Sequence, residues 1–175
     1  MTVVPPRAGP DRDRAVTARR DLTLTPIGVL RTPFRTRADC PRNGRVLDPA
    51  PLCHAEVLPA FHAGLDSLDG FSHLILLYWL DQAGPAQMLV TPASAREPHG
   101  VFATRAPVRP NPIGLAVVAF EGFEADGRLR VRYLDCLDGT TLLDIKPYLR
   151  TIDAEPAATL GWLTPHAGRS EAGGA

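Results

Sequence analysis

Residues 102–114 read Phe102-Ala-Thr-Arg-Ala-Pro-Val-Arg-Pro-Asn-Pro-Ile-Gly114 and run directly into the apolar stretch Leu115–Phe120. Three prolines in this segment fix φ at about −65° and hold each preceding residue in extended backbone. The segment cannot be a helix, and it makes a poor central strand because each proline removes a ladder donor. We predict a stiffened loop that leads into a strand. It presents Arg105, Arg109 and Asn111, whose donors suit carboxylates, phosphates and nucleobases.

The chain on both sides of this loop carries mostly strand signals. Ala125-Asp-Gly127 predicts a hairpin, and the run after it alternates Leu129, Val131 and Tyr133 against arginines. Asp138-Gly139 predicts a second hairpin. The predicted strands are 24–31, 55–58, 71–80, 113–124, 128–134 and 141–145, with a helix at 60–68 and loops at 32–51 and 84–98. We therefore predict a mainly β fold: a small β-barrel of mostly antiparallel, meandering strands with one or two short helices.

Composition restricts the function classes. The formal net charge is zero, so any contact with RNA must come from a local basic patch. Three widely spaced cysteines, with no zinc-site spacing among them, fit reduced thiols in a cytoplasmic protein, and we expect no metal. The N-terminus lacks the apolar run of a signal peptide, and the longest apolar run, 74–80, is too short to span a membrane.

The ends of the chain differ in composition from its middle. Residues 1–20 are rich in arginine and proline and predict a disordered leader. We expect a single domain over 21–153 and a flexible C-terminal tail over 154–175. Within that tail a lone Trp162 either frays with its neighbours or folds back on the domain.

The Pro-rich loop closely resembles the F-A-T-R-x-x-x-R-P-N-P-I-G signature of the TrmO family, also described as TsaA-like. Further blocks resemble the same family in the same order: Pro26-Ile-Gly-Val-Leu-Arg-Thr-Pro-Phe34, Pro41-Arg42, Phe71-Ser-His-Leu-Ile-Leu-Leu-Tyr78 and Leu137-Asp-Gly-Thr-Thr-Leu-Leu-Asp-Ile-Lys-Pro-Tyr148. The resemblance implies an S-adenosyl-L-methionine-dependent methyltransferase on a small β-barrel. It also implies a homodimer that methylates N6 of threonylcarbamoyladenosine next to the anticodon in tRNA.

The resemblance also implies a set of site residues. Those expected to bind the cofactor are Arg42, Asn43, Leu80, Asp81, Arg105, Leu115, Asp138, Gly139, Thr140 and Thr141. Those expected to bind the tRNA substrate are Arg35, Arg109 and Asn111. This chain departs from the family where Asn43 replaces a frequent glutamine, Ala106 a frequent serine and Thr141 a frequent proline.

Asp144, Lys146 and Tyr148 alternate along one predicted strand, so their side chains point to the same face. Lys146 is the only lysine among 19 basic residues. A carboxylate, an ammonium and a phenol on one face predict a catalytic group that orients the methyl acceptor, with Asp144 or Tyr148 as the proton acceptor.

Two other functions remain open at this stage. The zero net charge, Asn43 and the apparent lack of the extra C-terminal domain of longer bacterial members are compatible with an N-methyltransferase acting on a small-molecule amine. The third possibility is a non-catalytic regulatory protein that binds S-adenosyl-L-methionine.

Overall fold

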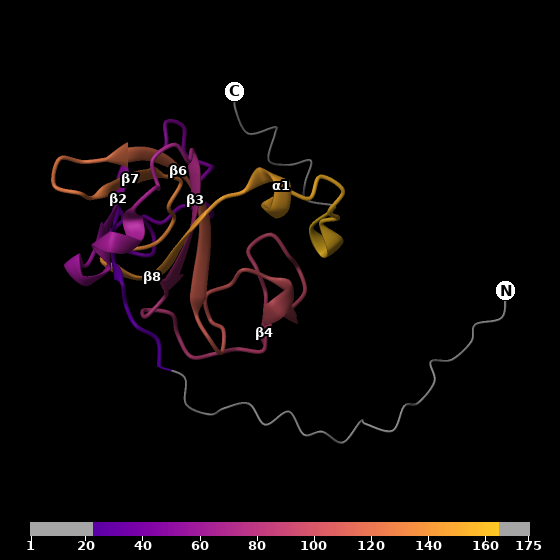
Figure 1. Ribbon diagram of the computed structural model, residues 1–175. Coiled ribbons are helices and arrows are strands. Elements are labelled where there is room, and N and C mark those ends of the chain that lie inside the picture. Colours follow the sequence, from indigo (N-terminus) through magenta and orange to yellow (C-terminus); the bar gives the residue numbers. More distant parts are fainter. Residues whose placement is uncertain (1–22, 165–175) are drawn as a thin grey trace, which may run out of the picture.

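A computed structural model of the chain describes residues 23–164, and the predicted leader lies outside them (Figure 1). Six strands form a closed barrel in the order β1-β2-β7-β6-β3-β8, and every neighbouring pair is antiparallel. Their bounds are β1 Gly28–Arg31, β2 Cys53–Val57, β3 His73–Trp79, β6 Ile113–Phe123, β7 Leu129–Arg132 and β8 Thr140–Pro147. The prediction of a small, mainly β, antiparallel barrel is confirmed.

The strands do not follow one another as a simple meander. Only β1–β2 and β6–β7 are paired neighbours in sequence, and the hairpin at Ala125–Gly127 is confirmed. The hairpin predicted at Asp138-Gly139 is wrong, because β7 and β8 do not pair. Instead, the Asp138 amide donates to the Phe34 carbonyl and the Gly139 amide to the Leu30 carbonyl, both at 2.8 Å. The turn signal predicted a local reversal correctly but not the partner of the strand that follows.

Short elements fill the connections. The predicted helix at 60–68 is a 3-10 segment, η1 (Pro59–Leu65), which has no buried residue to anchor a longer helix. The predicted loop 84–98 contains β4 (Leu89–Val90), which pairs with β5 (His99–Gly100) ahead of η2 (Val101–Ala103). Helix α1 (Arg150–Asp153) follows β8. Figure 1 shows the β4 region beside the barrel as a small lobe, with α1 above it. No helix within residues 23–164 has the length and apolar character needed to cross a membrane.

Several strand ends differ from the predictions by a few residues, and one difference changes which side chains face inward. The first strand begins at Gly28 rather than residue 24. At the end of β7, Tyr133 has a φ of 77°, so the expected alternation stops there and Leu134 is the buried residue. A tyrosine rarely adopts this left-handed conformation, which costs free energy unless surrounding contacts hold it.

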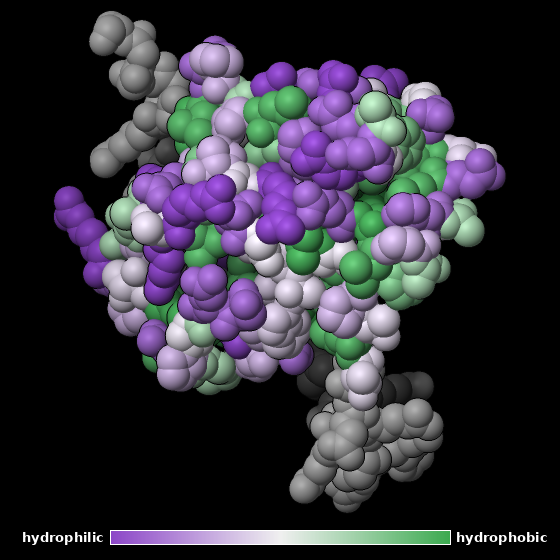
Figure 2. Space-filling view, turned by 90° about the vertical axis from the view of Figure 1, so that its left-hand side faces the viewer, coloured by the Kyte–Doolittle hydropathy of each residue, from purple (hydrophilic) through white to green (hydrophobic). Residues whose placement is uncertain are grey.

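The inner faces of the barrel strands form the core. Leu30, Leu74, Leu76, Val118, Leu129, Val131 and Leu142 are fully buried. Burying such a side chain contributes about 1.5–3 kcal/mol relative to leaving it exposed. Arginine–glutamate pairs, such as Arg31–Glu56 at 2.8 Å, lie on the outer surface. Figure 2 shows one such face, where polar side chains alternate with smaller apolar patches.

Gly114, the last residue of the Pro-rich motif, allows β6 to approach the ring of Tyr78 on β3. A Cβ atom at position 114 would lie 2.1 Å from the nearest carbon of that ring. Gly114 and Tyr78 are direct partners in the β3–β6 register, and Tyr78 is buried. The missing side chain therefore sets the position of the Tyr78 ring inside the barrel.

Gly114→Ala should lower the free energy of unfolding by about 1–3 kcal/mol, because overpacking forces the Tyr78 ring to move. The measurement is urea denaturation followed by circular dichroism. Gly64→Ala is the matched control, since its Cβ would meet no atom within 4 Å. Equal stability of the Gly114→Ala variant and the wild type would contradict the close approach.

Candidate functional site

The Pro-rich loop between η2 and β6 holds itself together through Arg109. One terminal nitrogen of this side chain donates to the carbonyls of Val101, Thr104 and Ala106 at 3.4, 2.9 and 3.3 Å. The Thr104 hydroxyl accepts from the Ala106 amide at 3.2 Å. Arg109, predicted to bind substrate, is thus placed as a brace of the loop.

Two backbone bonds attach the loop to the segment after β3. The Leu80 amide donates to the Pro112 carbonyl at 2.8 Å, and the Gln87 amide to the Val108 carbonyl at 2.9 Å. Asn111 is exposed, and its carbonyl accepts from the Ile113 amide at 2.7 Å. The loop is therefore rigid within itself and tied to residues 80–87, next to the predicted cofactor residues Leu80 and Asp81.

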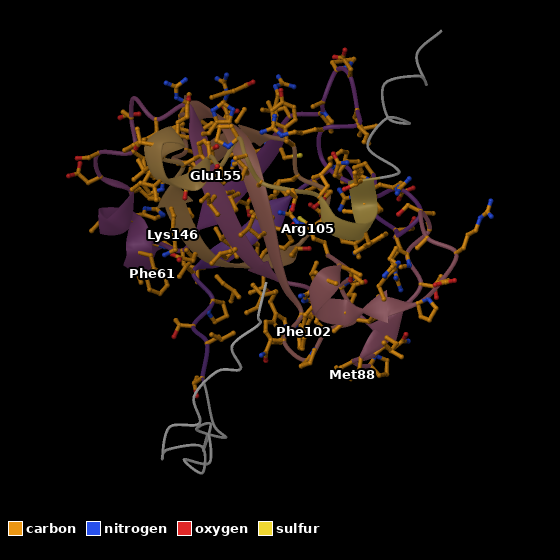
Figure 3. The ribbon with its side chains drawn as sticks, turned by 90° about the vertical axis from the view of Figure 1, so that its right-hand side faces the viewer. Phe61, Met88, Phe102, Arg105, Lys146 and Glu155 are labelled. Carbon is orange, nitrogen blue, oxygen red and sulfur yellow. The ribbon has the colours of Figure 1, made fainter. Side chains whose placement is uncertain are left out.

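A large cavity of about 1030 Å³ opens beside this loop. It is lined by residues 42–45, 92–94, 102–106 and 115–117 and by Tyr133, Asp135, Trp162 and Leu163. Four residues predicted to bind cofactor line it: Arg42, Asn43, Arg105 and Leu115. Ligand pockets typically measure about 300–1,000 Å³, so a cofactor of nucleoside size fits. Figure 3 shows Arg105 between the barrel and the lobe that carries Phe102 and Met88.

Tyr133 and the 42–45 segment build one wall of the large cavity together. The Arg45 guanidinium lies over the Tyr133 ring, 4.5 Å from its centroid. Gly44 packs so closely that a Cβ atom would lie 1.8 Å from the Tyr133 carbonyl oxygen. These contacts hold Tyr133 in its left-handed conformation. The sequence analysis did not assign a role to Tyr133 or Arg45.

A smaller cavity of about 150 Å³ lies beside the large one and contains three more predicted cofactor residues: Leu80, Asp81 and Thr140. Cys40 and Cys136 also line it. Asp135 lines both cavities, and it is the only acidic residue among the described residues around the large one. The predicted cofactor set is therefore divided between two cavities that meet at Asp135.

Asp135 is largely buried and accepts a hydrogen bond of 3.0 Å from the Tyr78 hydroxyl. Burial raises the pKa of the Asp135 carboxyl, while the Tyr78 hydrogen bond and the charge of Arg105 partly oppose this shift. Burial and Asp135 also raise the pKa of Tyr78. The sequence analysis missed Asp135. The available signal was a carboxylate directly after a buried leucine at the end of a strand.

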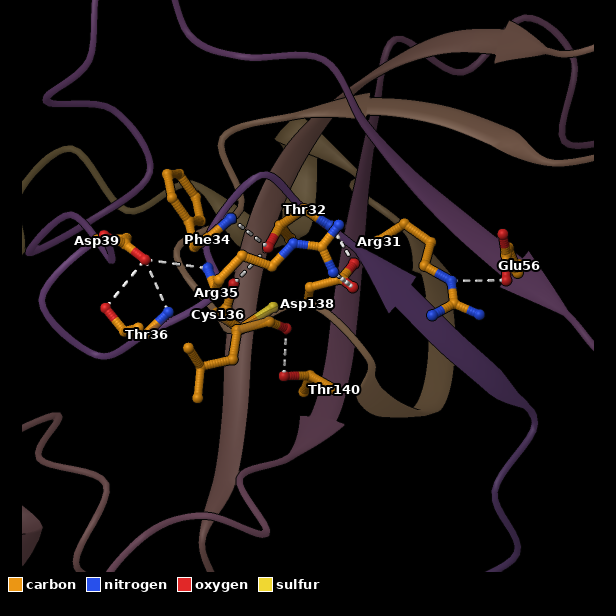
Figure 4. Close-up of polar contacts among 11 residues, drawn as sticks. Arg31, Thr32, Phe34, Arg35, Thr36, Asp39, Glu56, Cys136, Asp138 and Thr140 are labelled. Atoms are coloured by element: carbon orange, nitrogen blue, oxygen red, sulfur yellow. Dashed lines mark hydrogen bonds and ion pairs between the residues drawn. The ribbon is translucent and has the colours of Figure 1, made fainter.

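Asp138, another predicted cofactor residue, is occupied by contacts within the chain (Figure 4). It accepts from the Thr32 amide at 3.1 Å and from the Arg35 guanidinium, so a predicted cofactor residue and a predicted substrate residue pair with each other. Gly139 forms a turn at φ 80°, and the Thr140 hydroxyl donates to the Leu137 carbonyl at 2.7 Å. Thr141 lies in β8 opposite Trp79. This turn joins β1 to β8 and forms part of the wall behind the small cavity.

Asp144 and Lys146 do share one face of β8, and their side chains form an ion pair of 2.7 Å. The Tyr148 ring lies 6.2 Å from that of His73. None of the three lines either cavity described above. Asp144 is opposite Leu77, which is opposite Leu115, so Asp144 lies two strand spacings, about 10 Å, from the large cavity. Figure 3 shows Lys146 well to one side of Arg105.

The closed antiparallel barrel and its arginine-rich side cavity define a small-molecule-binding β-barrel domain. The chain belongs to the family of the tRNA-methyltransferase O N-terminal domain, whose model matches residues 29–154. This match confirms the family inferred from the sequence blocks.

Individual relatives agree with the family. An Archaeoglobus fulgidus protein named "S-adenosyl-L-methionine-binding protein" is 43% identical over 132 residues, which cover 75% of this chain and 93% of that protein. A second Archaeoglobus fulgidus protein, named "Probable S-adenosyl-L-methionine-binding protein", is 47% identical over 140 residues, covering 79% of this chain. The crystal structure of TrmO from Pseudomonas aeruginosa superposes with a TM-score of 0.67 at 42% identity and covers 81% of this chain. The matched region spans only 37% of the second archaeal protein and 62% of the TrmO chain.

Asp135 should make stability depend on pH in a characteristic direction. The folded protein keeps a proton on this carboxyl at a higher pH than the unfolded chain does, so ionisation costs stability as the pH rises above the ordinary value of 3.8. Asp135→Asn removes that cost, and its unfolding free energy should rise relative to the wild type between pH 4 and pH 7 (~3 pH units). Denaturation at several pH values measures the difference.

Asp126→Asn is the control of opposite sign. Arg128 lowers the pKa of Asp126, so the wild type should gain on this variant as the pH rises through the same range. Tyr78→Phe removes a hydrogen bond that lowers the pKa of Asp135, and should therefore steepen the loss of stability with pH. A pH-independent difference between Asp135→Asn and the wild type would contradict the assignment.

Proposed function

We propose that this protein is a cytoplasmic, S-adenosyl-L-methionine-dependent N-methyltransferase that methylates N6 of threonylcarbamoyladenosine next to the anticodon in tRNA. The observation that carries the proposal is the large cavity, whose walls include Arg105 and Leu115 from the two ends of the family motif. The family description and the names of the relatives support the cofactor and the reaction class.

The donors around the large cavity fit this cofactor. Arg42 and Arg105 offer guanidinium groups for a carboxylate, and Asn43 offers an amide for the edge of an adenine ring. Leu115, whose side chain is 46% exposed, supplies an apolar wall. Asp135 is a carboxylate suited to a cationic amino group. When bound, S-adenosyl-L-methionine supplies a methyl group on a sulfonium that is already a good leaving group.

The chain then has to hold the acceptor nitrogen and remove its proton. Good alignment alone can contribute roughly 7–11 kcal/mol to lowering the barrier. Asp135 is placed at the meeting point of the two cavities and has a raised pKa, so it can serve as the proton acceptor. Asp144, Lys146 and Tyr148 remain proposed as acceptor-orienting groups on the outer face of β8.

Contacts to tRNA phosphates are proposed for Arg42, Arg45 and Arg105, which surround the large cavity. Asn111 is exposed on the same loop as Arg105 and remains a proposed substrate contact. Arg35 is committed to Asp138, although its side chain is 74% exposed. Arg109 contributes by holding the loop. The zero net charge of the chain makes this local arrangement the only basic surface that the proposal requires.

Arg105→Ala should weaken S-adenosyl-L-methionine binding by about 10- to 150-fold, the effect of losing one hydrogen bond to a charged group. Calorimetry measures binding, and labelled cofactor with total tRNA from a strain lacking this protein measures transfer. Nucleoside mass analysis should find the label in methylated threonylcarbamoyladenosine. Arg128→Ala, at the β6–β7 hairpin, is the matched control and should behave as wild type.

The outcomes separate the three candidate functions. Cofactor binding without label in RNA would exclude tRNA and direct the search to small-molecule amines. Binding without turnover of cofactor on any acceptor would favour a regulatory binding protein, the role closest to the names of the archaeal relatives. No cofactor binding would overturn the proposal as a whole.

We also propose a homodimer, which the outer apolar face of β3 and β6 supports. Leu77 pairs with Leu115 and Trp79 with Ile113, and the two β6 side chains are 46% and 42% exposed. Ile113→Glu should convert a dimer into a monomer in sedimentation velocity, because it buries a charge at the interface. Leu24→Glu, at a position with 41% exposure before β1, should leave the dimer intact. A monomeric wild type would contradict the proposal.

A further inference from the structure

A second cavity of about 540 Å³ lies directly beside the large cavity, on the side of the β4–β5 lobe. It is lined by residues 93–97, His99 and Trp162. Ala93, Ser94 and Trp162 line both cavities, so the two spaces are contiguous. A ligand that occupies the large cavity can therefore continue into this second one.

Trp162 is held in place by two contacts. Its indole N–H donates to the Ala103 carbonyl at 2.8 Å, and its ring stacks on His99 with centroids 4.0 Å apart and planes inclined by 16°. Of the two possibilities raised for Trp162, the structure thus shows that it folds back on the domain. The family match ends at residue 154, so this wall comes from a segment outside the matched region.

The remaining groups of the second cavity are polar or charged. Arg96 is exposed and offers a guanidinium, Glu97 offers a carboxylate, and Ser94 offers a hydroxyl. An aromatic surface next to a guanidinium matches a nucleotide, in which a flat base is joined to a phosphate. Glu97 and Ser94 can accept hydrogen bonds from the amino groups on the edge of a base.

We propose that the second cavity binds one nucleotide of a single-stranded RNA segment adjacent to the methyl-acceptor nucleoside, an inference that rests on the proposed function. The base stacks on the aromatic pair of His99 and Trp162, and the Arg96 guanidinium contacts the phosphate. Single-stranded loops expose bases to this kind of stacking. The contiguous cavities place this nucleotide next to the one whose base is methylated.

Tryptophan fluorescence tests this binding directly. The chain contains two tryptophans, so Trp79→Phe leaves Trp162 as the only one. In that background, an anticodon-loop RNA oligonucleotide should quench the emission, with binding followed in parallel by anisotropy of the labelled RNA. Trp162→Ala should weaken RNA binding by about 5- to 150-fold and Trp162→Phe much less, because phenylalanine keeps a stacking surface.

The salt dependence of binding tests the phosphate contact. Arg96→Ala should lower the slope of log K against log salt by about 0.7, the value for one phosphate on a single strand. Arg128→Ala removes an equal charge at the β6–β7 hairpin, which Figure 1 places on the opposite side of the molecule from β4, and should leave the slope unchanged. A structural role of Arg96 would not move this slope.

Cofactor affinity and KM for RNA separate this inference from the proposed function. Trp162→Ala and Arg96→Ala should raise KM for RNA and leave S-adenosyl-L-methionine affinity within about 3-fold of wild type, since a factor of 3 is well under one kcal/mol. Unchanged KM and slope in an active enzyme would overturn the second cavity as a nucleotide site alone. RNA binding and quenching without methylation would overturn the proposed function alone. RNA binding without quenching, or no RNA binding, would overturn the inference.

Discussion

The pairing of β8 with both β1 and β3 closes the barrel, and the candidate site depends on this closure. Closure removes exposed edges and places the inner side chains of all six strands in one core. It also brings the segment between β7 and β8 against the end of β1, where Asp138 bonds to Thr32. Asp135 lies in the same segment and consequently meets Tyr78 of β3. The site is thus assembled by strand pairing, because no single segment contains it.

The Pro-rich loop contains two arginines that are alike in sequence but differ in their surroundings. Prolines remove backbone donors from the loop, so its carbonyls need donors from elsewhere. Arg109 satisfies three of them and makes the loop rigid without help from a neighbouring strand. Arg105 is then left to line the large cavity. The structural interpretation fits one arginine, and the functional interpretation fits the other.

Asp135 connects the electrostatics of the two cavities. Burial disfavours its ionised form, whereas Arg105 and the Tyr78 hydroxyl favour it. A cationic ligand group next to Asp135 would stabilise the ionised carboxylate further, and the carboxylate would hold that group in return. Gly114 is part of the same arrangement, because its lack of a side chain lets the Tyr78 ring take the position from which it reaches Asp135. The backbone of the motif and the charge in the cavity are therefore physically linked.

The sequence by itself determined the antiparallel strands, the β6–β7 hairpin, the proline-stiffened loop and the shared face of Asp144 and Lys146. These follow from turn chemistry and side-chain alternation, which act over a few residues. Only the tertiary structure decided the strand order, the left-handed Tyr133, the division of the predicted cofactor residues between two cavities and the docking of Trp162. These depend on contacts between distant segments, such as Thr32 with Asp138 across 106 positions, and local backbone preferences carry no information about such partners.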